Sequence, residues 1–202
     1  MRAHLITIAC TSLVVACASG EARESGPSRE PEAVTGTVVD SIFPLDEALR
    51  RFRIGIPEVA MLGGTAPSRD ALIDQFVSAL ESRDTAAFRQ MVLSRAEFAW
   101  LYYPTSTFSR EPFYQMPQLT WFLNIQDSEK GLTRVMERFG GAKLKFSAYE
   151  SPDTARTDGG LSFWDRCLVD FVHKGTARRL RLFGSIVELG GRYKFYSYAN
   201  DL

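Results

Sequence analysis

Residues 161–198 read LSFWDRCLVDFVHKGTARRLRLFGSIVELGGRYKFYSY. Apolar and polar side chains alternate along much of this stretch, and a period of two is typical of strands that bury one face. Two glycine-containing pairs, Lys174-Gly175 and Gly190-Gly191, fit the compact turns of β-hairpins. The stretch therefore predicts an antiparallel meander of three strands, at 161–173, 176–188 and 192–198.

The chain before this stretch follows a helical period instead. Ser68 suits the N-cap of one helix, and Asp84 begins a second. Ser94-Arg95-Ala96-Glu97 fits a capping box that begins a third helix, which we expect to end at Pro104. These helices carry their apolar residues on one face, as expected for helices packed on a sheet.

The longest predicted helix covers 117–139, with Pro117 in its first turn and Gly140-Gly141 at its end. Gly131 lies within it and is a candidate break. Helices therefore come first along the chain and antiparallel strands after them. This order indicates an α+β fold in which N-terminal helices pack on one face of a curved antiparallel sheet.

The bulk composition narrows the class of protein. The chain has 202 residues, of which 45% are hydrophobic and 24% charged, so it has the composition of a globular domain with appendages. The formal net charge is zero, which speaks against binding to nucleic acid because such binding needs a basic face. We see no internal repeat, and we expect one main domain at 67–202.

Residues 1–16 have a short positive start and an apolar run that is too short for an ordinary spanning helix, as in a cleaved signal peptide. The run ends in Val14-Val15-Ala16-Cys17, which resembles the lipobox of bacterial lipoproteins. This resemblance implies cleavage before Cys17 and diacylglycerol on its sulfur. Ala18 follows the lipidated cysteine, and in bacterial lipoproteins the absence of aspartate at this position favours the outer membrane. The alternative is an ordinary secretory signal with a chance cysteine.

Two segments separate the lipobox from the main domain. Residues 17–36 contain the lipidated cysteine and a polar linker without an apolar period, which predicts a disordered tether. Residues 37–66 form a pre-domain segment with a short amphipathic helix near 44–53. This helix either braces the domain or brings its arginines to anionic lipid heads.

The main domain resembles the NTF2-like group, which includes SnoaL-like and ketosteroid-isomerase-like proteins. The residues that carry the resemblance are ALIDQF at 71–76, SRDTAAF at 82–88 and GRYKFYS at 191–197. The resemblance implies a cone of helices wrapped by a bent sheet, with a concave pocket inside. It implies no activity, because this fold hosts enzymes, binding modules and inert partners alike.

Several kinds of chemistry find no support in the residues. After removal of the leader His173 is the only histidine, and no cluster has metal-ligand spacing, so we expect neither a metal nor a cofactor. The chain has no glycine-rich phosphate loop and no Gly-x-Ser-x-Gly elbow. Cys167 is expected to be a small buried core residue, with a nucleophile as the alternative.

Asp165 is the leading catalytic candidate. Alternation places it on the face of Phe163 and Cys167, where desolvation would raise its pKa and suit it as a general base. The other interpretations are pairing with a nearby arginine or a change of register at a bulge. An aromatic cluster offers the rest of a candidate ligand pocket, and the pocket set is Trp100, Tyr102, Tyr103 and Asp165.

The leading hypothesis is a cell-envelope lipoprotein, held by lipid on Cys17 at the periplasmic face of the outer membrane. Its domain would bind a small apolar ligand or an envelope protein without catalysis, and a homodimer is left open. One alternative is an isomerase, dehydratase or cyclase with Asp165 as base. Another is a structural assembly accessory, which predicts a filled cone and an exposed apolar patch.

Overall fold

The computed structural model describes residues 43–64 and 66–202. The predicted signal peptide at 1–16, Cys17 with the tether at 17–36, and the first residues of the pre-domain segment lie outside the described residues. The described part belongs to one compact unit, Ser41–Leu202. None of the helices within it has the length and apolar character needed to cross a membrane.

The helices begin where the sequence places their caps. The Ser68 hydroxyl accepts a hydrogen bond from the Ala71 amide, Asp84 accepts from two amides, and Ser94 and Glu97 form the predicted capping box. The described helices are α1 (Leu45–Phe52), α2 (Arg69–Ser82), α3 (Thr85–Met91), α4 (Arg95–Glu97) and α5 (Pro117–Phe139). Pro104 does not end α4 directly, because a π-helical turn and 3-10 turns follow it, at Phe98–Tyr102, Tyr103–Thr105 and Thr107–Ser109.

α5 has the predicted bounds and runs unbroken, so the candidate break at Gly131 is wrong. The glycine is there because another backbone approaches the helix closely. A Cβ at this position would lie 1.9 Å from the carbonyl oxygen of Tyr198. Gly131 therefore lets the C-terminal segment pack directly on α5.

The α+β class is confirmed, but the prediction of three long strands in one sheet is wrong. In the described residues the strands form two antiparallel sheets, of order β1-β4-β5 and β2-β3-β6-β7. The first contains β1 (Lys145–Glu150), β4 (Leu168–His173) and β5 (Thr176–Leu180). The second contains β2 (Arg156–Asp158), β3 (Leu161–Trp164), β6 (Ile186–Leu189) and β7 (Arg192–Phe195). The predicted strands 161–173 and 176–188 each split in two and pass from one sheet to the other.

The residues at the two breaks explain the split. Arg166 has a φ of 59°, a left-handed conformation that interrupts the first strand. In the second, Leu182 and Phe183 are both fully buried. Both pack in the same core cluster, and because consecutive residues of a regular strand point to opposite faces, they can do so only where the strand ends.

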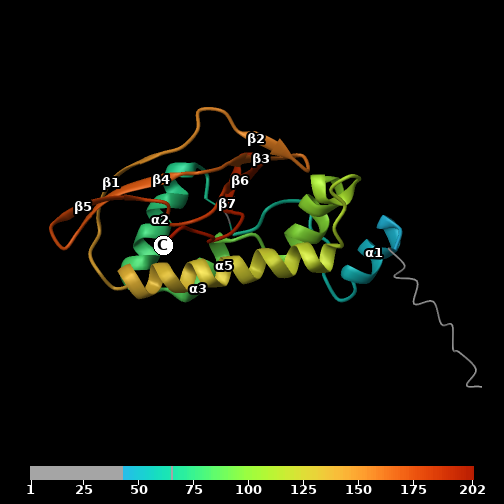
Figure 1. Cartoon of the computed structure of the whole chain (residues 1–202), viewed down its shortest axis with the longest axis horizontal. Coiled ribbons are helices and arrows are strands. Elements are labelled where there is room, and N and C mark those ends of the chain that lie inside the picture. The colour runs from blue at the N-terminus through green and yellow to red at the C-terminus, as the bar shows by residue number, and fades with distance from the viewer. Residues whose placement is uncertain (1–42, 65) are drawn as a thin grey trace, which may run out of the picture. The chain divides into compact units, whose positions relative to one another are not determined.

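The core has two parts. The first lies between the helices and both sheets and is rich in aromatic rings, with the Phe76 ring 5.3–5.5 Å from the rings of Phe88, Phe183 and Phe195. The second joins α1 and the π-helical turn to β3 and β6. The strands lie on one side of the unit and α5 lies along the other (Figure 1). Buried side chains of the first core cluster, which come from α2, α3, α5 and the strands, pack in the space between them.

Candidate functional site

Asp165 lies at the break between β3 and β4 and is partly exposed, not buried on the apolar face. Its carboxylate accepts hydrogen bonds from the Ser185 hydroxyl and, at 3.0 Å, from the Arg156 guanidinium. Burial acts to raise its pKa, but these two hydrogen bonds outweigh burial and hold the pKa below its usual value. Of the alternatives left open, the structure therefore places Asp165 in a pair with an arginine.

A second carboxylate, Asp158 at the end of β2, is buried and was missed by sequence reasoning. It accepts hydrogen bonds from the Tyr102 hydroxyl at 2.9 Å and from the amide and hydroxyl of Thr107 at 2.8 and 3.0 Å. The Arg156 guanidinium lies 3.6 Å from Oδ2, the oxygen that also accepts from Tyr102, and it connects Asp158 to Asp165. Residues 151–160 carry no periodic signal, so only the tertiary structure could reveal this polar network.

Tyr102 and Tyr196, whose rings pack together beside Asp158, keep their hydroxyl protons at neutral pH. Burial is the main cause that raises the pKa of Tyr102 above its usual value, with Tyr196 and Asp158 adding to it. Burial also raises the pKa of Tyr196 to about 12. Since Asp158 already interacts with four groups of three residues and Asp165 is ionised and paired, the network joins β2 and β3 to the π-helical turn without leaving a free acid or base.

The other predicted pocket residues do not meet at a common cavity. Tyr103 is fully buried, and its hydroxyl donates to the carbonyl oxygens of Phe108 and Gln115. Trp100 lines a separate surface pocket beside α1, where the Arg53 guanidinium stacks 3.8 Å from the centre of its ring. Tyr102 reaches Asp165 only through Asp158 and Arg156. The predicted pocket set is therefore divided between core packing and surface contacts.

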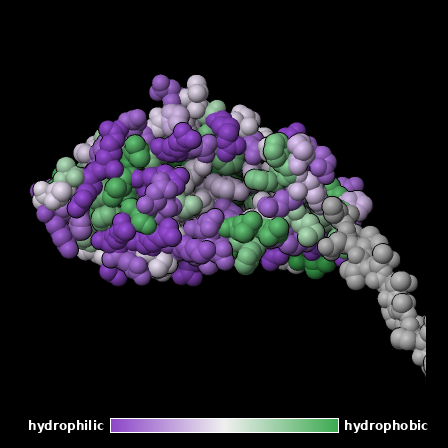
Figure 2. Space-filling model, in the orientation of Figure 1, coloured by the Kyte–Doolittle hydropathy of each residue, from purple (hydrophilic) through white to green (hydrophobic). Residues whose placement is uncertain are grey.

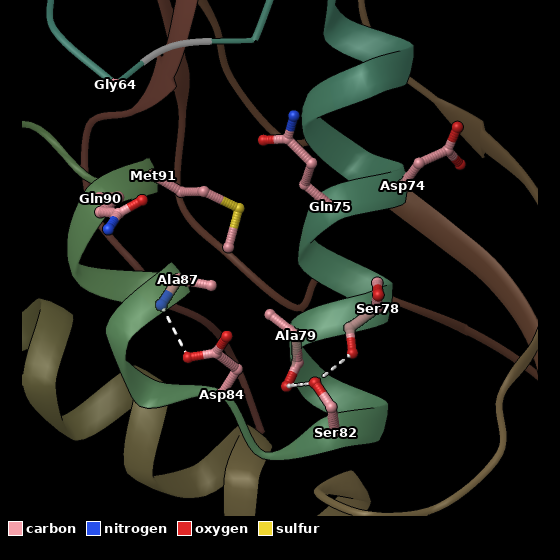
Figure 3. Close-up of a pocket in the computed structure, with 10 residues that line it drawn as sticks. All are labelled: Gly64, Asp74, Gln75, Ser78, Ala79, Ser82, Asp84, Ala87, Gln90 and Met91. Carbon is pink, nitrogen blue, oxygen red and sulfur yellow. Dashed lines mark hydrogen bonds between the residues drawn. The ribbon is translucent and has the colours of Figure 1, made fainter.

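The cavity between α2 and α3 is an open surface groove of about 650 Å³. Gln75 and Met91 point towards one another across it (Figure 3). Asp84, at the lower end, is already engaged because it caps α3 through the amides of Ala86 and Ala87. The groove lacks an aromatic wall and a basic group among its lining residues, so it is a poor site for an apolar or anionic ligand.

A different surface stands out, which we call the α5 apolar face. It consists of five large apolar side chains with 41–61% of their surface exposed, Phe113, Met116, Leu119, Phe122 and Leu123. The space-filling view shows an apolar patch over the first half of α5 (Figure 2). The signal that sequence reasoning missed is the run PFYQMPQLTWFLNIQ at 112–126, which has no charged residue in a chain where 24% are charged.

Cys167 is completely buried, as expected of a core residue. Burial raises the pKa of its thiol to about 11, so the reactive thiolate is scarce at neutral pH. Within residues 43–64 and 66–202, His, Cys, Asp and Glu side chains do not gather in a group of three that could hold a metal ion.

Comparisons of the chain with protein-family models, with curated proteins and with solved structures found no match.

Proposed function

We propose that this protein is a membrane-anchored, non-catalytic lipoprotein of the cell envelope that acts through surface contact at the α5 apolar face. The observation that supports it most directly is the combination of a filled interior with this exposed face. A binding protein for a small apolar ligand, or an isomerase-type enzyme, would need an enclosed pocket with convergent polar groups. An exposed apolar face in a folded domain is instead typical of an interaction site.

The bent-sheet architecture of NTF2-like proteins is part of this proposal. Its support is the path of the chain, because β3 continues into β4 and β5 into β6, so each pair crosses from one sheet to the other. Under this proposal, the two sheets that share two continuous segments are the halves of one strongly bent sheet, and aromatic side chains occupy the inside of the bend.

The anchoring is supported by the lipobox pattern at residues 14–17, and intact mass tests it. We expect the mature protein to begin at Cys17 and to carry the added mass of a diacylglycerol and an acyl chain. A Cys17→Ser variant should keep its leader and lack the lipid, while the control Cys167→Ser should be acylated normally. An unmodified mature chain that begins at another residue would contradict the proposal.

Native mass spectrometry of residues 41–202 tests the absence of a ligand pocket. We expect the bare mass, because the interior is filled. A co-purified small molecule that survives gentle ionisation and is lost on denaturation would restore the ligand-binding hypothesis. If that molecule's affinity or turnover then depended on Asp165→Asn, the enzyme hypothesis would replace ours.

A further inference from the structure

We infer that the α5 apolar face rests in the interfacial layer of the same bilayer that holds the lipid anchor. This inference depends on the proposed function, since it needs the chain to be acylated at Cys17. The α5 apolar face would contact lipid headgroups and the upper acyl chains directly, with no protein partner between them.

The composition of the face fits a lipid surface. Leu119, Phe122 and Leu123 follow the spacing i, i+3 and i+4, so they share one side of α5, and Met116 and Phe113 extend that side past the helix start. Residues 112–126 contain no charge that would have to enter the interface. Amphipathic helices that lie in the interface bury an apolar face of this kind by about 5–10 Å.

The second half of α5 limits the depth of insertion. Its exposed side turns from apolar to charged after Gln126, beginning with Asp127, Glu129 and Lys130. A helix with this division can lower its first turns into the headgroup layer while its later turns stay in water. The contact is therefore tilted and shallow.

The point at which the anchored segment joins the domain lies beside the face. The carbonyl oxygen of Phe43, the first described residue, accepts a hydrogen bond from the Tyr114 hydroxyl at 3.2 Å. Tyr114 is the direct neighbour of Phe113 in the face. α1, which follows Phe43, packs on α5. The chain that leads to Cys17 therefore leaves the domain at the edge of the α5 apolar face.

The length of that segment keeps the face close to the bilayer. Phe43 follows Cys17 by 26 positions (43 − 17), and a chain of this length spans at most about 90 Å when fully extended. A group tethered by a short chain experiences an effective concentration in about the millimolar range at its target. A weak contact that would not recruit the free domain is therefore occupied once the anchor is inserted.

The size of the face favours lipid over a second copy of the chain. Its five side chains are about half exposed, and a large apolar side chain offers roughly 200 Å², so the face presents about 500 Å². A stable interface between proteins buries about 800 Å² on each partner. A bilayer needs no matching surface and can receive a patch of this size.

Site-specific fluorescence on the acylated full chain tests the inference. A polarity-sensitive dye is attached at Gln118→Cys, an exposed polar position in the first turn of α5, and at Arg178→Cys on β5 as the control; Cys167 is buried and unreactive. The protein is placed in vesicles of phosphatidylethanolamine and phosphatidylglycerol. We expect spin-labelled lipid to quench the dye at position 118 several-fold more than at 178, and aqueous iodide to do the reverse.

A triple variant supplies the matched comparison. Leu119→Ser, Phe122→Ser and Leu123→Ser together should make the dye at position 118 accessible to quenching by iodide, while the protein stays on the vesicles. The control Met61→Ser, which removes an apolar side chain that is 55% exposed elsewhere, should not change the quenching. Equal iodide access at 118 and 178 in the unmutated chain would overturn the inference. Protection from iodide without quenching by spin-labelled lipid would also overturn it, because a protein would then cover the face.

The experiments distinguish a chain that lacks the lipid anchor from a chain whose α5 apolar face does not contact the bilayer. If intact mass shows no lipid on Cys17, the proposed function fails, and the face is tested with an artificial anchor. The chain from residue 18, with an N-terminal hexahistidine tag, is then held on nickel-chelating lipid in the same vesicles. Lipid quenching at position 118 on that anchor supports the face, and its absence contradicts it.

Discussion

Two buried charged groups are held by side chains that come from distant parts of the chain. Asp158 binds Tyr102 and Thr107, 56 and 51 positions away, and Glu97 binds Lys194 across 97 positions. Burying a charge is unfavourable unless it is paired and hydrogen-bonded. Each carboxylate therefore holds in place the elements that its partners belong to, and removing it leaves those partners unpaired.

Asp158→Ala should lower the free energy of unfolding by about 2–4 kcal/mol, because it leaves buried donors without an acceptor. Urea unfolding of residues 41–202 measures the change. Asp153→Ala, which changes an exposed aspartate in the connection between β1 and β2, is the control and should stay within about 0.5 kcal/mol of the original chain. Similar values for the two variants would show that the Asp158 network is not structural.

Glu97 makes stability depend on pH. Burial acts to raise its pKa, but hydrogen bonds from the Ser94 amide, Lys194 and the Gly63 amide outweigh burial and lower it. Because the folded pKa is lowered, the stabilisation is complete above the unfolded value of 4.5 and is lost as the pH falls through the folded pKa.

Glu97→Gln should therefore destabilise the protein by about 3 kcal/mol near neutral pH, since the Lys194 ammonium stays buried without a counter-charge. The difference from the original chain should narrow as the pH falls below about 4.5, where the original chain loses the same charge. Urea titrations across this range measure it. Glu137→Gln, which changes an exposed glutamate of α5, should show no difference at any pH, and a constant gap for Glu97→Gln would contradict the assignment.

At the scale of elements, the break between β3 and β4 turns the chain from one sheet into the other. Arg166 holds a left-handed backbone there, which an L side chain disfavours and glycine accepts. Arg166→Gly should raise the free energy of unfolding by about 0.5–1 kcal/mol. Arg178→Gly, in the regular strand β5, should lower it by a similar amount. Destabilisation by both variants would mean that the Arg166 side chain has a role of its own.

The close approach at Gly131 belongs to the same scale. Alanine is a better helix former by about 1 kcal/mol, but its Cβ would overlap the Tyr198 backbone. Gly131→Ala should therefore lower the free energy of unfolding by about 1–3 kcal/mol net, as overpacking does. Thermal unfolding measures this change. The control Thr133→Ala, at an exposed position of α5, should be neutral or slightly stabilising in the same measurement. A stabilised Gly131→Ala would disprove the contact.

For the whole molecule, the segment before Ser68 is part of the core. Leu49, Phe52 and Leu62 are all at most 7% exposed and pack in the second core cluster with Phe98. Removing them should lower the free energy of unfolding by about 1.5–3 kcal/mol for each side chain. The free energy of unfolding of a whole domain is commonly about 5–15 kcal/mol.

The chain that begins at residue 68 should therefore unfold well below the melting temperature of the chain that begins at residue 41. Thermal unfolding followed by circular dichroism measures both. A chain that begins at residue 17 is the control and should melt together with the chain from residue 41. Equal melting temperatures of the two shortened chains would show that the segment at 41–67 does not stabilise the domain.

Part of this architecture follows from local sequence. The caps at Ser68, Asp84 and Ser94 and the bounds of α5 depend on side chains that bond to their own neighbours, so a short window contains the needed information. The helix-then-strand order likewise sufficed for the α+β class. The lipid anchor at Cys17 is a prediction of the sequence that the described residues do not test.

The strand breaks, the pairing of Asp165 and the network around Asp158 could not be predicted in the same way. Alternation continues through Asp165 in the sequence, and only the close approach of Arg156 and Ser185 in space shows that this carboxylate is paired. The α5 apolar face was hidden for a related reason: a helical period shows which residues share a side, but not whether another element covers that side. Local patterns specify the elements of this protein, whereas contacts between distant residues decide what is buried, and burial determines the chemistry and the surface that remain.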